Sequence, residues 1–371
     1  MAHKKYNLIL LIPLGILLAV FISLGLWVQP INGDLTRLGG FTENDFGWNK
    51  PQQQFPSVLF TFDEGKEYKN YHDVVVLGDS FSHTFPLSQW QNYFVRETGY
   101  SLITYKVDDI DIESFVNSPA FKDRPPRIVI YQTVERSFVG RGNSWNKGDC
   151  QPEPTPALRE SPLKIRPGIQ TLSDYTRSTE NGPLHPNLSS GAHYLKRLIK
   201  KTFNKKSNRA IKIALSRNDL FSNRQSSHLL VYRNDFERYG VLEEDLKRAI
   251  CGLTYIQNTF QKNGKTYFVG MVAPDKLTAY MDVYKDFDRK KIHWMDEITK
   301  HPELHVPRLD VALKKEIERG TQDVYLPNDT HWGSSGHQAV ASHLLKYLID
   351  RNILAPFPGN SGSEPTNTLP G

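Results

Sequence analysis

The chain has 371 residues with a formal net charge of +6, and 39% of its residues are hydrophobic. This length allows one large domain with an insertion, or two domains. Its only two cysteines, Cys150 and Cys251, do not belong to a Cys-x-x-Cys pair, which argues against a zinc site or a thiol redox centre.

The first predicted element is a membrane anchor. Residues 8–28 form an apolar run of 21 residues without a charge, long enough to span a bilayer as a helix. His3, Lys4 and Lys5 precede this run, so the positive-inside rule places the N-terminus in the cytoplasm. A cleaved signal peptide is the alternative, but the run is long and no clear cleavage site follows it. We therefore predict a single-pass protein of the inner (cell) membrane, with residues 1–28 as tip and anchor and the rest of the chain in the periplasm.

Export affects how the cysteines and the charge are interpreted. In an oxidising compartment Cys150 and Cys251 can form a disulfide, and two separate buried thiols are the equal alternative. Between Gly191 and Arg233 there are eleven Lys or Arg residues and one acid, Asp219. Such a cluster attracts an anionic polysaccharide or a membrane surface, and a solvated helix face is the alternative. Nucleic acid is not an expected partner, because an exported chain does not meet it.

After a stalk or wrapping segment over residues 29–69, strands and helices alternate. The run Asp73–Leu77 is apolar and β-branched, as expected for a strand buried on both faces of a parallel sheet. Further strands are predicted at 100–107 and 127–134, and helices at 86–98 and 108–123. This alternation predicts an α/β fold, with a doubly wound, mostly parallel sheet flanked by helices.

The pattern breaks between about residues 140 and 240, which are rich in Pro, Asn, Ser and basic residues. A structureless stretch of this length is unusual inside a domain, so we interpret it as an insertion or lid. Order then resumes, and the main domain is expected to cover residues 70–355, before a disordered tail at 356–371. The elements expected in this part are a helix at 242–262, a strand at 266–272, a helix at 309–319, a short strand at 324–326, and a final helix with Ser334 or Ser335 as its N-cap.

Ser80 is the first candidate catalytic residue. It follows the first predicted strand directly, and in open α/β folds the carboxyl edge of the sheet is where ligands bind. Gly78 lets the chain turn sharply, and the free N–H of Ser80 at the start of the next element is a natural oxyanion donor. The alternative is that Asp79 and Ser80 only cap a helix.

Asp329 and His331 complete the constellation. In an extended segment, residues two apart share a face, so the carboxylate can fix the imidazole tautomer. The other ring nitrogen is then free to take a proton from a serine. A loop with a structural histidine is the alternative. Because the pair lies between a short strand and a capped helix, much as Ser80 does, we predict a Ser80–His331–Asp329 triad.

Gly78-Asp79-Ser80 together with Asp329-Thr330-His331-Trp332 resembles the SGNH hydrolase superfamily, especially its polysaccharide O-acetyltransferase branch. The branch signature is matched in most respects from Asp329 to Ala341. Pro274–Tyr280 is similar to the Pro-x-Lys-x-x-x-Tyr segment of the branch, and Glu135-Arg136 to its acid–Arg pair. The resemblance covers roughly residues 70–140 and 250–350 and does not cover the insertion.

The chain departs from the family in three respects. The serine precedes the Asp-x-His motif, whereas the alginate members have the reverse order. Ordinary members have Asp-x-x-His, which is one residue longer. The usual Gly and Asn oxyanion donors on the second and third strands are missing, because Gln132-Thr133 stands where Gly-x-Asn is expected. Gln132 and Arg136 are therefore the candidate donors beside the Ser80 N–H, with a salt bridge to Glu135 as the alternative for Arg136.

The resemblance implies an SGNH-like or flavodoxin-like fold and a periplasm-facing O-acetyltransferase. It would act on an exported polysaccharide through an acetyl-enzyme, and a membrane-bound O-acyltransferase would supply the acetyl group. An acetyl-ester hydrolase and a non-catalytic polysaccharide-binding protein of the same fold are the alternatives.

Further substrate contacts are expected from Lys276, Tyr280 and Trp332. Lys276 and Tyr280 are four residues apart and share a face if this segment is helical, where they could hold a sugar or an acetyl donor. A surface pair is the alternative. No cofactor is expected. A metal site that joins Asp329 and His331 to His83 or His337 lacks a recognised ligand spacing.

Overall fold

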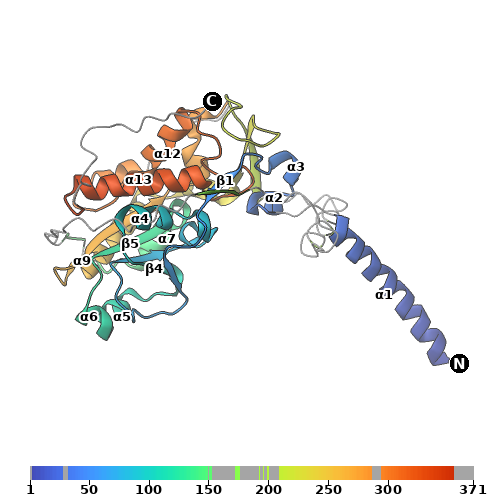
Figure 1. Ribbon diagram of the computed structural model, residues 1–371, viewed down its shortest axis with the longest axis horizontal. Helices are drawn as coiled ribbons and strands as arrows, with labels where there is room; N and C mark the ends of the chain where they lie inside the picture. The colour runs from blue at the N-terminus through green and yellow to red at the C-terminus, as the bar shows by residue number, and fades with distance from the viewer. Residues whose placement is uncertain are drawn as a thin grey trace.

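A sheet lies at the centre of the molecule (Figure 1). It has five strands in the order β2-β4-β3-β5-β9, and every neighbouring pair is parallel. The computed structural model describes residues 2–27, 32–148, 150–152, 172–175, 192, 195, 199, 209–285 and 294–354. The strands are β2 (Thr61–Asp63), β3 (Val74–Gly78), β4 (Leu102–Lys106), β5 (Ile128–Val134) and β9 (Tyr267–Ala273). The predicted α/β architecture, a parallel sheet flanked by helices, is confirmed. The edge strand β2 is the one that the sequence pattern does not predict.

The sheet is buried on both faces, which explains its continuous apolar strands. All five residues of β3 are buried. Val74 and Val76 belong to one hydrophobic cluster, and Val75 and Leu77 belong to the other. Successive side chains point to opposite faces, so a strand covered on both sides needs apolar residues at every position.

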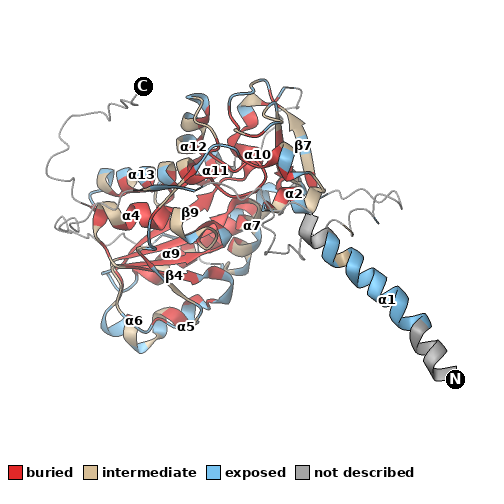
Figure 2. Ribbon diagram, turned by 45° about the vertical axis from the view of Figure 1, so that its right-hand side comes forward, coloured by how far each residue is buried: buried red, intermediate tan, exposed pale blue. Residues whose placement is uncertain are grey.

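Each face of the sheet is covered by its own layer of helices, and their sheet-facing sides are buried (Figure 2). One layer contains α4 (Trp90–Thr98), α12 (Leu309–Glu318) and α13 (Ser334–Asp350). The other contains α5 (Ile112–Asn117), α6 (Pro119–Asp123), α7 (Glu135–Ser144) and α9 (Glu243–Gln261). The short helices α10 (Lys276–Ala279) and α11 (Trp294–Thr299) add buried residues to the first and second layers respectively.

Three sequence predictions in this region need correction. The helix expected at 108–123 is divided into α5 and α6, because the residue before Pro119 disfavours helical geometry and Ser118 caps the second helix instead. The strand expected at 324–326 lies outside the sheet and forms only an isolated antiparallel bridge between Tyr325 and Trp332. Gly333, not Ser334 or Ser335, is the N-cap residue of α13.

The N-terminal helix α1 (Ala2–Trp27) extends away from the rest of the molecule (Figure 1). Large apolar side chains between Ile9 and Ile22 are exposed along it (Figure 2). Within the described residues, no helix has both the length and the hydropathy needed to cross a bilayer. The membrane-spanning helix predicted over residues 8–28 therefore has no support from the structure.

The described part of the 29–69 segment wraps around the domain. It forms α2 (Asp34–Gly39), α3 (Glu43–Phe46) and β1 (Gln52–Gln54) before the edge strand β2. Leu35 of α2 and Phe46 of α3 pack with Ala210 and Leu230 of the predicted insertion in a small hydrophobic cluster. The N-terminal segment and the insertion thus support each other.

The described parts of the insertion include three strands and a 3₁₀ helix. They are β6 (Ser173–Tyr175), which pairs antiparallel with β1, the antiparallel pair β7 (Ala210–Ala214) and β8 (His228–Tyr232), and the 3₁₀ helix η4 (Arg233–Gly240). Most of the basic cluster and the predicted tail at 356–371 lie outside the described residues. The predicted domain boundaries stay predictions.

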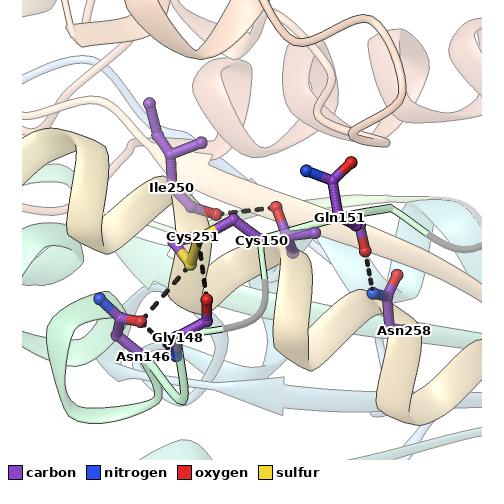
Figure 3. Close-up of a disulfide and its surroundings, with 8 residues drawn as sticks. Asn146, Gly148, Cys150, Gln151, Ile250, Cys251 and Asn258 are labelled. Atoms are coloured by element: carbon purple, nitrogen blue, oxygen red, sulfur yellow. Dashed lines mark hydrogen bonds between the residues drawn. A yellow bond between two sulfur atoms is a disulfide. The ribbon is translucent and has the colours of Figure 1, made fainter.

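A disulfide joins Cys150 to Cys251 and fixes the chain after α7 to helix α9 (Figure 3). The Asn258 amide donates a hydrogen bond of 2.7 Å to the Gln151 carbonyl beside it. Of the two alternatives for these cysteines, the structure has the disulfide. The same two helices approach closely at Gly252, where a Cβ atom would lie 1.8 Å from the carbonyl oxygen of Gly142.

Removing this disulfide should destabilise the protein. Its cysteines are 101 residues apart, so the cross-link restricts a long loop of the unfolded chain. We expect the double variant Cys150→Ala/Cys251→Ala to lose about 2–4 kcal/mol of unfolding free energy, measured by denaturant titration. Because the chain has no other cysteine, a reductant should destabilise the wild type and leave the double variant unchanged. Equal stability of the two oxidised proteins would contradict the expectation.

Candidate active site

Ser80 begins the 3₁₀ helix η1 (Ser80–Ser82) directly after β3, at the carboxyl edge of the sheet. Its side chain is exposed. Within the part of the chain that the structure describes, neither its N–H nor its hydroxyl makes a hydrogen bond. Both groups are therefore available to a ligand, the hydroxyl as a nucleophile and the N–H as an oxyanion donor.

Asp79 joins the turn at Ser80, here called the serine turn, to the neighbouring strand β5. One carboxylate oxygen, Oδ1, accepts the Phe81 N–H at 3.1 Å, which caps η1. The other, Oδ2, accepts the Val134 N–H at 2.6 Å and Arg141 Nη1 at 2.8 Å. Arg141 also forms an ion pair with Asp108. The capping alternative thus describes Asp79 correctly, while Ser80 is left free.

Sequence reasoning missed Arg141. Burial opposes its charge, but Asp79 and then Asp108 outweigh burial and raise its pKa, so the guanidinium stays charged. It lies near the end of α7, and the sequence pattern did not predict that helix. Without the helix, no feature of the sequence places this arginine beside the serine turn.

Gln132 supports the turn and is not a free oxyanion donor. It is fully buried on β5. Its Oε1 accepts the Asp79 N–H at 3.0 Å and the Ser82 hydroxyl at 2.8 Å, and its Nε2 donates to Asp79 Oδ1 at 2.9 Å. The prediction that Gln132 contacts the reacting group has no support from the structure, in which its amide holds Asp79 and Ser82.

Asp329 and His331 form the predicted pair. Asp329 Oδ1 lies 2.6 Å from His331 Nδ1 and accepts the His331 backbone N–H at 3.0 Å. Both residues are buried, in a turn between the bridged residues Tyr325 and Trp332. The other ring nitrogen, Nε2, has no hydrogen-bond partner among the described residues. This arrangement favours the tautomer with the proton on Nδ1 and leaves Nε2 as a base.

The two groups shift each other's protonation. Burial raises the pKa of the Asp329 carboxyl, but the charge and hydrogen bonds of His331 outweigh burial and lower that pKa. Burial lowers the pKa of His331, but the Asp329 carboxylate outweighs burial and raises it above the ordinary 6.5. An ionised Asp329 beside His331 is the arrangement that a general base in a triad requires.

Phe81 connects the serine turn to the turn that carries Asp329 and His331, here called the histidine turn. Its ring packs against the His331 imidazole, with ring centroids 4.8 Å apart, and edge-on against Trp332 at 4.7 Å. The residue next to Ser80 thus contacts His331 directly. Ser80 and His331 are not hydrogen-bonded to each other in the described structure, and free enzymes often tighten this contact only when substrate binds.

Lys276 supports the histidine turn by hydrogen bonds to its backbone. It is 1% exposed, and its Nζ donates to the carbonyl oxygens of Leu326, Pro327 and Asp329 at 2.6, 3.0 and 3.1 Å. Burial lowers its pKa to about 7. Tyr280 is also fully buried, and its hydroxyl accepts the Tyr325 N–H. Both side chains are enclosed in the core and bonded to the chain, so the prediction that they hold a substrate has no support from the structure.

The substitution Lys276→Met should therefore disturb the turn without removing any group that contacts substrate. Buried carbonyls that lose their donor cost about 1–3 kcal/mol, so we expect a loss of about 2–3 kcal/mol in unfolding free energy, together with lower activity. The exposed Lys346, whose partner among the described residues is Asp350 on α13, gives the matched control Lys346→Met. Equal unfolding free energies for the two variants would show that Lys276 does not support the turn.

Arg136 lies at the edge of the site and pairs with carboxylates other than Glu135. Its Nη1 is 2.6 Å from Asp275 and 3.6 Å from Asp235, which belongs to η4 of the insertion. Burial opposes its charge, but Asp275 and Asp235 outweigh burial and raise its pKa. Its charge also lowers the pKa of His331, although less than Asp329 raises it. The salt bridge to Glu135 is not formed, since Glu135 accepts the Asp275 N–H and the Thr278 hydroxyl instead.

A pocket of about 210 Å³ adjoins the histidine turn at Trp332. Its walls include the aromatic side chains of Trp48, Phe85 and Tyr175. Tyr175 belongs to β6, so the insertion contributes to the pocket. Phe85 has a φ of 55°, a left-handed conformation that is uncommon for residues other than glycine and recurs at ligand-binding sites. Trp332 lines this pocket but is itself buried, so its contact with a substrate stays a prediction.

Among the described residues, neither His83 nor His337 belongs to a group of side chains that could hold a metal ion. The Nε2 atom of His83 lies 3.1 Å from the Gly78 carbonyl oxygen and 3.2 Å from that of Tyr105. His337 is buried against Trp332, and burial lowers its pKa to about 3. The donor atoms of Asp34, Asp329 and His331 lie within 4.8 Å of one another. All three residues are already joined by hydrogen bonds, so an ion there would have to displace those bonds.

No family model, curated protein or solved structure matches the chain. The assignment of function therefore depends on the residues of the site.

Proposed function

We propose that the chain is a serine-dependent acyl-transfer enzyme of the SGNH type, with a Ser80–His331–Asp329 triad. The observation that supports this most is the buried Asp329–His331 pair, whose free Nε2 belongs to an imidazole packed against the residue after Ser80. The exposed Ser80 hydroxyl, which makes no hydrogen bond within the described residues, supplies the nucleophile.

The chemistry proceeds in two steps. Ser80 Oγ attacks the acyl carbonyl carbon while His331 Nε2 takes the hydroxyl proton, and the Ser80 N–H donates to the oxyanion. The tetrahedral intermediate expels the leaving oxygen, which receives the proton from His331, and the acyl group stays on Ser80. An acceptor hydroxyl then attacks the acyl carbon as His331 takes its proton. The bond between the acyl carbon and Ser80 Oγ breaks, His331 returns the proton to Oγ, and the acyl group stays on the acceptor.

We further propose that the acyl group is acetyl and the acceptor is an exported, anionic polysaccharide, so that the enzyme is an O-acetyltransferase. The likeness of Asp329–Ala341 to the O-acetyltransferase branch supports this. The aromatic pocket beside Trp332 offers flat faces on which a sugar ring can stack. A membrane-bound O-acyltransferase in the inner membrane would supply the acetyl group, and the disulfide is compatible with an oxidising compartment such as the periplasm.

A serine-directed fluorophosphonate tests the proposed nucleophile. We expect it to modify Ser80, identified by peptide mass spectrometry, and to leave the Ser80→Ala variant unmodified. A probe that labels no residue of the folded wild type would favour a binding protein without turnover. Analysis of products over time with a sugar acceptor present separates transfer from hydrolysis, because a transferase moves the acetyl group to the sugar and a hydrolase releases acetate.

A further inference from the structure

Asp34 lies in the segment that follows the N-terminal helix. It both donates hydrogen bonds to the histidine turn and accepts them from it. Its backbone N–H donates to Asp329 Oδ2 at 3.1 Å. Its own carboxylate accepts the Thr330 N–H at 2.9 Å and the Thr330 hydroxyl at 2.7 Å. The side chain of Asp329 is thus held by His331 on one oxygen and by Asp34 on the other.

The neighbours of Asp34 strengthen this attachment. The N–H groups of Leu35 and Thr36 both donate to the Asn328 carbonyl, at 3.0 and 3.3 Å. The buried Glu43 accepts Asn328 Nδ2 at 2.7 Å and the Gly33 N–H at 3.1 Å. At Gly33 a Cβ atom would lie 2.1 Å from the Asn328 carbonyl oxygen, so only glycine permits this approach. Residues 33–43 therefore clamp the Asn328–Thr330 turn through bonds other than those made by Lys276.

We propose that Asp34 is a positioning residue of the catalytic centre, which aims the Asp329 carboxylate at His331 and adds a second negative charge beside the imidazole. This inference rests on the proposed triad. It extends the site to a segment that lies 295 residues from Asp329 in the sequence. No contact between Asp34 and substrate is required, because Asp34 acts through Asp329 and Thr330.

The charges around His331 define what Asp34 adds. Asp329 and Asp34 favour the imidazolium, and Arg136 opposes it. Lys276 lies beneath Asp329, and His337 is buried nearby with a pKa of about 3, so it is neutral at physiological pH. The pKa of Asp34 itself is raised, first by burial and then by Asp329. Ionised Asp34 raises the pKa of His331, so removing its charge should lower that pKa.

Asp34→Asn is the discriminating variant, because it keeps the backbone N–H to Asp329 and the approximate shape of the side chain. His331 must be neutral to act as a base, so activity rises with pH through its pKa. We expect the acid limb of the kcat/KM profile to move to lower pH in Asp34→Asn, with a lower kcat at the plateau. Asp34→Glu, which restores the charge, should return the acid limb towards its wild-type position. The exposed carboxylate of Asp123 gives the control Asp123→Asn, which should leave the profile unchanged.

An NMR titration of the imidazole separates this inference from the proposed function. In a histidine-labelled Ser80→Ala background, with the His331 signal assigned by its loss in His331→Gln, Asp34→Asn should lower the pKa of His331. This readout needs no activity, so it tests Asp34 even if Ser80 proves not to be a nucleophile. An unchanged pKa of His331 in folded Asp34→Asn protein would overturn the inference. An unshifted acid limb in an active Asp34→Asn enzyme would overturn it as well.

Discussion

Replacing Ser80 with alanine should lower the rate of acyl release on the order of 10⁴-fold, with no loss of folding. The hydroxyl makes no hydrogen bond within the described structure and is exposed, so its removal breaks no internal contact. The residual rate of the variant comes from direct attack of water on the ester, which the other triad members and the oxyanion donor still assist. The measurement is turnover of an activated acetyl ester, with thermal unfolding recorded for both proteins.

A second serine provides the matched control for this experiment. Ser57 is also exposed and lies in a bend before the sheet, with no hydrogen bond among the described residues. Ser57→Ala should keep the wild-type rate. If Ser80→Ala also keeps the wild-type rate, Ser80 is not the nucleophile and the proposed mechanism is wrong.

The second large effect is expected for Asp329→Asn, which should also cost on the order of 10⁴-fold in kcat. In the structure, Asp329 Oδ1 faces Nδ1 of His331 while Oδ2 accepts the Asp34 N–H. If an asparagine at position 329 keeps its oxygen towards His331, its NH₂ group faces the Asp34 N–H. Two donors then meet without an acceptor. The opposite orientation satisfies Asp34 but presents an N–H to Nδ1. That orientation places the imidazole proton on Nε2, which can then no longer accept the serine proton.

The control for Asp329→Asn is a buried carboxylate away from the site. Asp310 is 5% exposed and pairs with Arg308. Asp310→Asn removes a buried negative charge as well, so it is expected to reduce stability and leave kcat unchanged. A kcat of Asp329→Asn close to that of Asp310→Asn would mean that Asp329 does not set the tautomer of His331.

The sheet strands β3, β4, β5 and β9 and the Asp329–His331 pair were predictable because both depend on local patterns. An apolar run such as Val74–Leu77 identifies a strand that is buried on both faces. The two-residue spacing places a carboxylate and an imidazole on one side of an extended turn. The contact between Asp329 and His331 could therefore be predicted from the sequence alone.

The supporting residues were not predictable, because their roles depend on contacts between distant segments. Lys276 has the spacing of a substrate-binding residue, but its place beneath the histidine turn comes from the packing of α10 against Leu326–Asp329. In the sequence Asp34 belongs to a predicted stalk or wrapping segment, and only the contact of α2 with Asn328 places it at the site. Gln132 occupies the strand position expected for an oxyanion donor, yet the serine turn uses its amide. In each case the chemistry of the residue was evident and its partner was not.

The most direct test of the triad is the intact mass of the protein after brief exposure to an activated acetyl donor. The account predicts that the wild-type protein gains the mass of one acetyl group, that peptide mapping places this group on Ser80, and that Ser80→Ala gains none. His331→Gln should gain it far more slowly, because no base is left to take the serine proton. A folded wild-type protein that gains no acetyl group at Ser80, or a Ser80→Ala variant that is acetylated as fast as the wild type, would contradict the account.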